Sequence, residues 1–274
     1  YFTKDGMAFR RTSTVGLEGG FGSVRLGRML TSSYLAVSRY DAFGDTGIGA
    51  TRAWAKGYSP RAENAISYTS PSFSGFKFGG EYGFGEKKDA RDVRYFGLAG
   101  TYDNGPLSLG LGYDRANNTH GNAAPNPVTA AWTAAAASDI TTWQLGGAYN
   151  FGVVKVLGFY KDSKTKPAAG GKATGKFKTF GLGLTAPVGA AGEVKVAYNN
   201  YRDSAAATTK KADQLSLGYV HNLSKRTALY GTYAYLKNNK KNGLDLELNG
   251  AMPGAGLSDS GAQHGLQVGI RHAF

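Results

Sequence analysis

Apolar and polar residues alternate along segments of about ten residues that recur from one end of the chain to the other. In the last segment Leu266, Val268 and Ile270 take every second position, and Gln267 and Gly269 lie between them. Because successive side chains of a strand point to opposite faces, such a strand has one apolar face and one polar face. The pattern therefore predicts strands that separate hydrocarbon from water.

The same alternation predicts thirteen strands along the chain. A tilted strand of about ten residues, rising about 3.3 Å per residue, spans the apolar band of roughly 25 Å in an outer-membrane barrel. We therefore predict an all-β fold, a transmembrane antiparallel β-barrel that forms a single domain over residues 1–274. The predicted strands lie near residues 9–18, 22–30, 61–70, 75–85, 93–102, 107–114, 140–149, 153–162, 176–186, 193–202, 212–221, 226–237 and 263–274.

Short and long connections alternate between the predicted strands, as in outer-membrane barrels with their short periplasmic turns and long external loops. A soluble Greek-key sandwich gives no reason for such regularity. Tight turns are predicted at residues 19–22, 70–72, 103–106, 150–152 and 222–225, and longer polar loops at roughly 31–60, 115–138, 163–174, 203–211 and 238–261.

The number of predicted strands is odd, whereas single-chain bacterial barrels have an even number and keep both termini on the periplasmic side. The first predicted strand runs from a loop-like segment toward a short turn, so it enters the membrane from outside. Three further strands before it would give sixteen and would close an edge that cannot stay open in lipid. We therefore expect the natural protein to be longer, with three more strands at its N-terminal end.

Composition favours a thin wall over a large soluble core. Only 41% of the residues are hydrophobic, yet the chain holds 17 Tyr, 14 Phe and 41 Gly. No run approaches the roughly 20 consecutive apolar residues that a membrane helix needs. Tyrosines at strand ends are expected to form an aromatic girdle near the short turns. These are Tyr68, Tyr82, Tyr102, Tyr113, Tyr149, Tyr198 and Tyr219.

The formal net charge of +13 allows nucleic acid, an anionic membrane surface or anionic solutes as partners. Lysines concentrate in the predicted loops, and arginines more often lie in or beside the predicted strands. A nucleic-acid binder usually gathers both types on one helix or patch, so nucleic acid is not expected as a partner. Basic loops are instead suited to contact lipopolysaccharide phosphates.

Candidate catalytic and metal-binding residues are few. The chain has no cysteine, which excludes disulfides and thiolate metal sites. Its four histidines show no metal-ligand spacing, and the serines near them are too generic to support a Ser–His–Asn site. Glycine-rich pieces such as 181–183 lie inside predicted strands, so a phosphate-binding loop before a helix is not expected. We predict no enzyme activity, no metal and no cofactor.

Several distinctive patterns follow one another along the chain. Residues 21–28 read Phe-Gly-Ser-Val-Arg-Leu-Gly-Arg, and residues 41–44 read Asp-Ala-Phe-Gly. Residues 68–71 read Tyr-Thr-Ser-Pro, residues 223–227 read Leu-Ser-Lys-Arg-Thr, and the chain ends in Val-Gly-Ile-Arg-His-Ala-Phe. In this order the set resembles the general diffusion porins of Gram-negative outer membranes, in the branch common among β-proteobacteria. Ala42 stands where that family carries proline.

The resemblance implies a sixteen-stranded barrel in the outer membrane, surrounded by lipid and lipopolysaccharide and assembled as a homotrimer. It also implies a water-filled channel for passive diffusion of ions and small hydrophilic solutes, with a weak preference for anions. In the family the third external loop folds into the lumen, and by order that constriction loop is residues 31–60. Acidic groups on such a loop facing arginines on the wall would create a field across the narrowest point.

Candidate selectivity residues come from both the family positions and the alternation. Arg61 fits both, because it shares its face with Glu63 and Ser67, opposite Ile66 and Tyr68. The candidates are Arg10, Arg11, Arg25, Arg28, Arg61 and Glu63 on the wall, and Arg39, Asp41 and Asp45 on the loop.

The two arguments disagree for two pairs of arginines. Alternation points Arg10 and Arg25 inward and Arg11 and Arg28 outward, whereas the family positions favour Arg11 and Arg28. A bulge near the loop end of either strand would reverse the assignment.

Two other functions stay open at this point. A substrate-specific channel for phosphate, organic acids or oligosaccharides needs a ladder of aromatic residues or arginines in the lumen, whereas the predicted inward faces carry mostly Gly, Ser, Thr, Ala and Gln. A closed structural barrel or adhesin is the third hypothesis. Swelling of proteoliposomes in sugar solutions separates an open lumen from a closed one.

Overall fold

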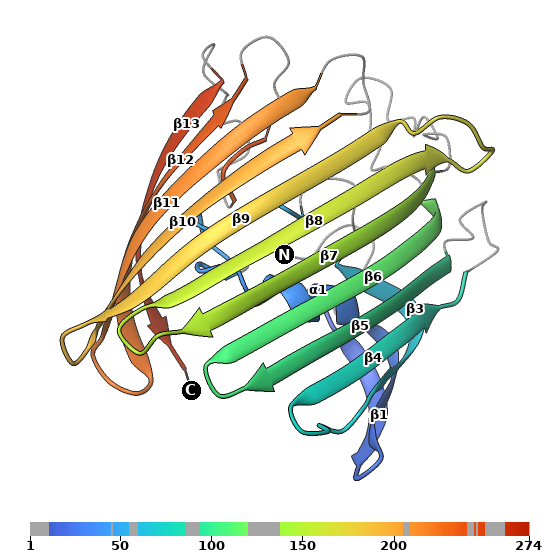
Figure 1. Cartoon of the computed structure of the whole chain (residues 1–274), viewed down its shortest axis with the longest axis horizontal. Coiled ribbons are helices and arrows are strands. Elements are labelled where there is room, and N and C mark those ends of the chain that lie inside the picture. The colour runs from blue at the N-terminus through green and yellow to red at the C-terminus, as the bar shows by residue number, and fades with distance from the viewer. Residues whose placement is uncertain are drawn as a thin grey trace, which may run out of the picture.

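The computed structural model describes residues 11–44, 46–54, 60–85, 94–119, 138–204, 209–239, 244, 246–249 and 261–273. Within these residues, thirteen strands form one antiparallel sheet in which each strand pairs with the next along the chain. The strands are tilted, the sheet curves strongly, and α1, Ser32–Ser38, lies on its concave side (Figure 1). The strands are β1 Ser13–Gly19, β2 Gly22–Leu30, β3 Arg61–Thr69, β4 Phe76–Gly83, β5 Arg94–Asn104, β6 Leu107–Thr119, β7 Ser138–Asn150, β8 Lys155–Pro167, β9 Gly175–Val188, β10 Gly192–Asp203, β11 Lys210–Asn222, β12 Thr227–Asn238 and β13 Ala262–His272.

All thirteen predicted strands are present, and the predicted all-β antiparallel fold is confirmed. Several strands extend further toward the long connections than the apolar alternation suggested. β6 continues to Thr119 and β7 begins at Ser138, with polar residues in these extensions. The extensions pair by backbone hydrogen bonds, which do not depend on side-chain hydropathy, so the hydropathy pattern underestimates them.

The two faces of the sheet have inverted burial compared with a soluble protein. On β13 the side chains of Leu266, Val268 and Ile270 are 78%, 76% and 65% exposed. On the concave face the polar side chains of Gln144 and Lys161 are buried. Apolar groups therefore point away from the protein on the convex face, as expected for a wall that contacts lipid. No helix in the described part of the chain is long and apolar enough to cross a bilayer.

The predicted tyrosine girdle is correct for four residues and wrong for three. Tyr82 lies next to the long-loop end of β4, and Tyr113 and Tyr198 lie near the middle of β6 and β10. Tyr113 instead lies in a line of aromatic rings, 6.5 Å from the Phe96 ring and 4.5 Å from the Trp143 ring. The tyrosines that do lie close to short turns are Tyr68, Tyr102, Tyr149 and Tyr219.

Candidate functional site

The segment after β2 folds onto the concave side of the sheet. Thr31 caps α1, because its hydroxyl accepts a hydrogen bond from the Tyr34 backbone N–H at 3.4 Å. The helix then lies against the concave faces of β4, β5, β6 and β7 (Figure 1). We call the described residues of this segment, 31–44 and 46–54, the inner loop.

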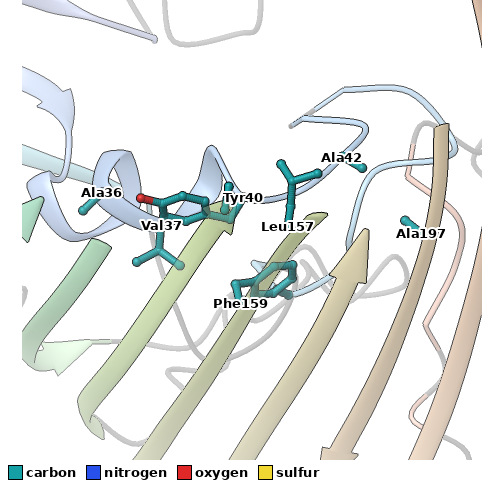
Figure 2. Close-up of a cluster of buried hydrophobic side chains, with 9 residues drawn as sticks. Ala36, Val37, Tyr40, Ala42, Leu157, Phe159 and Ala197 are labelled. Carbon is teal, nitrogen blue, oxygen red and sulfur yellow. The ribbon is translucent and has the colours of Figure 1, made fainter. Parts of the chain in front are cut away.

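Small residues on the wall make room for the inner loop. A Cβ added at Gly112 would lie 2.7 Å from the Ser33 Cβ, and one added at Gly218 would lie 2.6 Å from the Phe43 ring. Val37 and Tyr40 pack beside Leu157 and Phe159 of β8 (Figure 2). These inward-facing glycines therefore leave space for the backbone and rings of the inner loop to approach the wall.

Acidic side chains of the wall receive hydrogen bonds from the first half of the inner loop. Ser32 N–H donates to Glu81 at 3.0 Å, and the Ser33 hydroxyl donates to Asp114 at 2.8 Å. Both carboxylates are covered by the loop, with Glu81 4% and Asp114 3% exposed. The two carboxylates therefore bind donors of the loop and are shielded from water on the concave side of the sheet.

Arg39 and Asp103 form a third contact of this kind. Both terminal nitrogens of Arg39 donate to the two oxygens of Asp103, each at 3.1 Å. Partial burial lowers the pKa of the Arg39 guanidinium, but its hydrogen bonds to Asp103 and Tyr40 outweigh that effect and leave the pKa above its ordinary value. Two parallel N–H···O bonds fix both position and orientation, so Arg39 attaches the end of α1 to the wall.

Lys161 of β8 anchors the second half of the inner loop. Its side chain is fully buried, its ammonium group donates to the Ala53 carbonyl at 2.8 Å, and it lies 5.1 Å from the centre of the Trp54 ring. Lys161 also interacts electrostatically with Asp114. A buried ammonium is stable only with such partners, so the loop and the wall depend on each other here.

Tyr201 and Gln214, on the opposite side of the wall, also bind the second half of the inner loop. The Tyr201 hydroxyl accepts from the Arg52 backbone N–H at 2.8 Å and donates to Gln214 Oε1 at 2.8 Å. Gln214 Nε2 in turn donates to the Ala50 carbonyl at 3.1 Å. Ile48 N–H donates to Gln267 of β13 at 3.1 Å. The inner loop thus contacts the wall from β4 across to β13.

A second segment also folds inward, and sequence reasoning missed it. Leu244, Leu246 and Leu248 are buried and pack with Phe177 and Tyr201 on the concave face. The backbone of Leu246 exchanges hydrogen bonds with the Asn238 side chain at 2.9 and 3.1 Å. The signal was present, because the sequence Leu-Asp-Leu-Glu-Leu alternates like a strand inside a region interpreted as a polar external loop.

The two inward segments touch each other. Arg52 donates to Asn249 Oδ1 at 3.0 Å, and Ile48 packs against the cluster that holds the three leucines. Burial lowers the pKa of Arg52, against the opposing influence of Tyr201 and Glu247. Arg52 thereby links the inner loop with residues 246–249.

The predicted loop residues have different surroundings. Arg39 binds the wall, as described, and Asp41 is buried and accepts from the backbone N–H groups of Phe43 at 3.1 Å and Thr51 at 2.7 Å. Asp41 therefore stabilises the fold of the loop itself. Asp45 lies outside the described residues, as does Arg10 on the wall.

The predicted wall residues do not all gather in one place. Arg28 forms an ion pair with Glu63, and Arg61 Nε donates to the Arg11 backbone carbonyl at 3.1 Å. Arg25 is exposed, and its Nε lies 3.4 Å from the Ser23 hydroxyl.

An irregularity in β3 changes the assignment of faces. Gly27 pairs with Ala65 and Met29 with Ala62, so Arg28 faces two residues, Glu63 and Asn64. Asn64 has a positive φ of 45°, which a bulge often requires. The alternation argument for Arg61 was therefore wrong.

The inward side is marked by buried residues beyond the bulge. Met29 and Ala62 are 5% and 2% exposed and belong to the same buried cluster. Arg61 pairs with Leu30, and its side chain lies on the opposite face of the sheet from that of Ala62. Simple alternation counted from Ile66 and Tyr68 fails because the bulge adds one residue to β3 but none to its partner β2.

On the concave face, most acidic side chains are buried or paired, whereas several basic side chains are exposed. Glu81 and Asp114 are buried, Asp103 is paired with Arg39, and Glu193 lies 3.2 Å from Lys195. Glu18 is an exposed acid on this face. Exposed bases on this face include Arg25, which pairs with Ser67, and Arg271, which pairs with Ala228. Lys77, on the face of Glu81, and Lys155, on the face of Leu157, are also exposed. The water-facing charge of the described wall is thus mainly positive. No group of three or more potential metal ligands occurs in the described residues.

The sequence profile described as Gram-negative porin matches residues 2–241. The chain belongs to the Gram-negative porin family. This porin is 43% identical over 281 residues to outer membrane porin protein 32 of Delftia acidovorans, an alignment that covers 98% of the chain and 75% of the relative. It is 31% identical to an outer membrane porin protein of Bordetella pertussis, over 86% of the chain and 68% of the relative.

Among solved structures, this porin matches an anion-selective porin from Comamonas acidovorans with a TM-score of 0.82 and 44% identity. That match covers 97% of the chain and 78% of the Comamonas protein. The predicted family, the outer-membrane location and the function as a porin channel are confirmed. The matched relatives are porins, which are channels.

Proposed function

We propose that this porin is a passive channel for small hydrophilic solutes with a weak preference for anions. The observation that supports it best is the separation of charge by burial on the concave face. Acids near the inner loop are covered or paired, whereas Arg25, Lys77 and Lys155 face the water. A channel lined by exposed positive charge between low-dielectric walls raises the local concentration of anions. The related porin from Comamonas acidovorans is described as anion-selective, which agrees with this proposal.

The preference is measured as a reversal potential in planar bilayers under a KCl gradient. We expect a sign that corresponds to chloride permeating faster than potassium. The double variant Lys77→Gln/Lys155→Gln should bring the permeability ratio closer to one. The matched control is Lys225→Gln, in the turn between β11 and β12. A wild-type potential of the cation-selective sign contradicts the proposal.

We further propose that residues 31–60 form the constriction of the channel, together with residues 244–249. The inner loop contacts the wall from β4 to β13, and Arg52 links it with Asn249. Two segments on the concave side reduce the open cross-section more than one. Exclusion is measured by proteoliposome swelling with sugars of increasing size. Deletion of residues 246–249 should admit larger sugars, and an unchanged size limit argues against the second segment.

The assembly proposed for this porin is a homotrimer. A related fold, OmpT of Vibrio cholerae, has a structure described as a trimer form, at 16% identity and a TM-score of 0.73. The exposed apolar side chains of the convex face can be covered by lipid or by a neighbouring subunit. Light scattering of the detergent-solubilised protein, corrected for bound detergent, gives the subunit number. A single-chain mass contradicts the trimer.

A further inference from the structure

Three cations lie side by side on the convex face, at the ends of strands that lead to the long connections. Lys178 of β9 pairs directly with Arg202 of β10, and Arg202 pairs directly with Lys211 of β11. Each of the three is next to a buried residue of the concave face, so the three point outward. Those buried neighbours are Phe177, Tyr201 and Ala212. We call Lys178, Arg202 and Lys211 the cation row.

The next position toward the loops adds two more cations. Lys164 of β8 pairs directly with Lys176 of β9. Like charges directly opposite each other on a sheet are destabilising. The Asp162 carboxylate lies 3.3 Å from the Lys178 ammonium at one end of the cation row. At this end of the row a single ion pair with Asp162 is thus set against five clustered bases.

A second acid nearby is already engaged. Asp213 accepts from the Tyr198 hydroxyl at 2.6 Å and from the Asn200 amide at 2.7 Å. Arg202 Nε donates to Asn200 Oδ1 at 2.9 Å, and among the described residues no side chain accepts a hydrogen bond from its two terminal nitrogens. Asp162 and Asp213 therefore offset only part of the repulsion among the five bases, which favours binding of an external anion.

The position of the row relative to the apolar band points to the source of that anion. On β9 the same outward face continues with Phe180, Leu182 and Leu184, which are 42%, 48% and 44% exposed. The row begins where these apolar side chains end, on the side of the long connections, which are external in such barrels. This is the level of the headgroups in the outer leaflet.

We propose that the cation row binds the phosphate groups of a phosphorylated lipid headgroup in the outer leaflet. Two strand spacings of about 4.8 Å separate its ends, so phosphate oxygens can contact neighbouring cations at once. Arginine in the centre offers paired N–H donors to a phosphate, and the flanking lysines act as point charges. The row faces lipid and not the lumen, so this site is independent of the proposed ion selectivity.

Native mass spectrometry of the detergent-solubilised porin tests the site with bisphosphorylated lipid A as the probe. We expect the wild type to retain this lipid, and the triple variant Lys178→Gln/Arg202→Gln/Lys211→Gln to retain it roughly tenfold less or weaker still. The conservative variant Lys178→Arg/Lys211→Arg keeps the charge and should retain the lipid, provided that heat-modifiability on gels shows both variants folded. Lys225→Gln/Arg226→Gln, at the opposite end of the barrel, is the matched control.

Two further arms separate the lipid from other anions. Lipid A lacking both phosphates should be retained little by any variant. Inorganic phosphate should compete weakly, because it lacks the acyl chains that hold the headgroup against the apolar band. Equal retention by the wild type and the triple variant overturns the proposal. So does equal loss in the control, or inorganic phosphate displacing the lipid at equal concentration.

Discussion

Replacement of Lys161 by methionine is expected to detach the inner loop from the wall while the thirteen-stranded sheet stays intact. The ammonium group is fully buried, donates to the Ala53 carbonyl at 2.8 Å and interacts electrostatically with Asp114. Methionine keeps most of the side-chain volume, so packing changes little. What is lost is the hydrogen bond to the loop and the compensation of the Asp114 charge.

The size of the effect follows from the burial of both groups. Removing one partner of a buried charge pair costs about 3–5 kcal/mol, because the other charge stays without compensation. When the loop moves away, water can reach Asp114. The substitution therefore destabilises the attached position of the loop, whereas the backbone pairing of β6 with β7 and of β7 with β8 is kept. A change of this size shifts the ratio of attached to detached loop roughly 10²- to 10⁴-fold.

Single-channel recording in planar bilayers measures the loop position as open-channel current. Lys161→Met should raise the current noise and change the mean conductance, because the loop then occupies more than one position. Lys155→Met, on the exposed part of the same strand, should leave the noise at the wild-type level. Lys161→Met/Asp114→Asn should recover part of the quiet current, because it removes the uncompensated charge as well. Noise and conductance equal to the wild type in Lys161→Met would refute the reasoning.

Three other predictions concern the same loop and the channel charge. Tyr201→Phe removes the hydroxyl shared by Arg52 and Gln214 and should weaken loop attachment by about 1–3 kcal/mol, seen as noise below that of Lys161→Met. Arg52→Gln should speed the labelling of Leu248→Cys by a water-soluble thiol reagent, because residues 246–249 lose their contact with the loop; an unchanged labelling rate contradicts this. The anion preference should fall as salt rises at a fixed gradient ratio, because the Debye length shrinks from about 10 Å at 0.1 M to about 3 Å at 1 M; a preference independent of salt would place its origin elsewhere than in exposed charges.

The sequence was sufficient for the strands, the turns and the lipid-facing side. Each strand of such a wall meets two different solvents, so the alternation of Leu266, Val268 and Ile270 with small or polar residues records the environment of every position locally. The turns at 19–22 and 222–225 are equally local, because they depend on a few adjacent residues. These features need no knowledge of distant parts of the chain.

The surroundings of the inner loop were decided by the tertiary structure. Lys161 meets Ala53 and Gln214 meets Ala50 across more than one hundred residues of sequence, and no local pattern encodes such pairs. Asp41 was expected to face the channel, but its carboxylate accepts hydrogen bonds from the loop backbone.

The faces of single residues near an irregularity were likewise beyond the sequence. Arg61 was assigned by counting from Ile66, and one extra residue at the Asn64 bulge reversed the count. Alternation fixes each side chain relative to its neighbours, so a local backbone change moves every assignment beyond it. The sequence by itself determined which residues form the wall and which side meets lipid. The three-dimensional packing alone decided which charges of the wall are covered by the loop and which still face water.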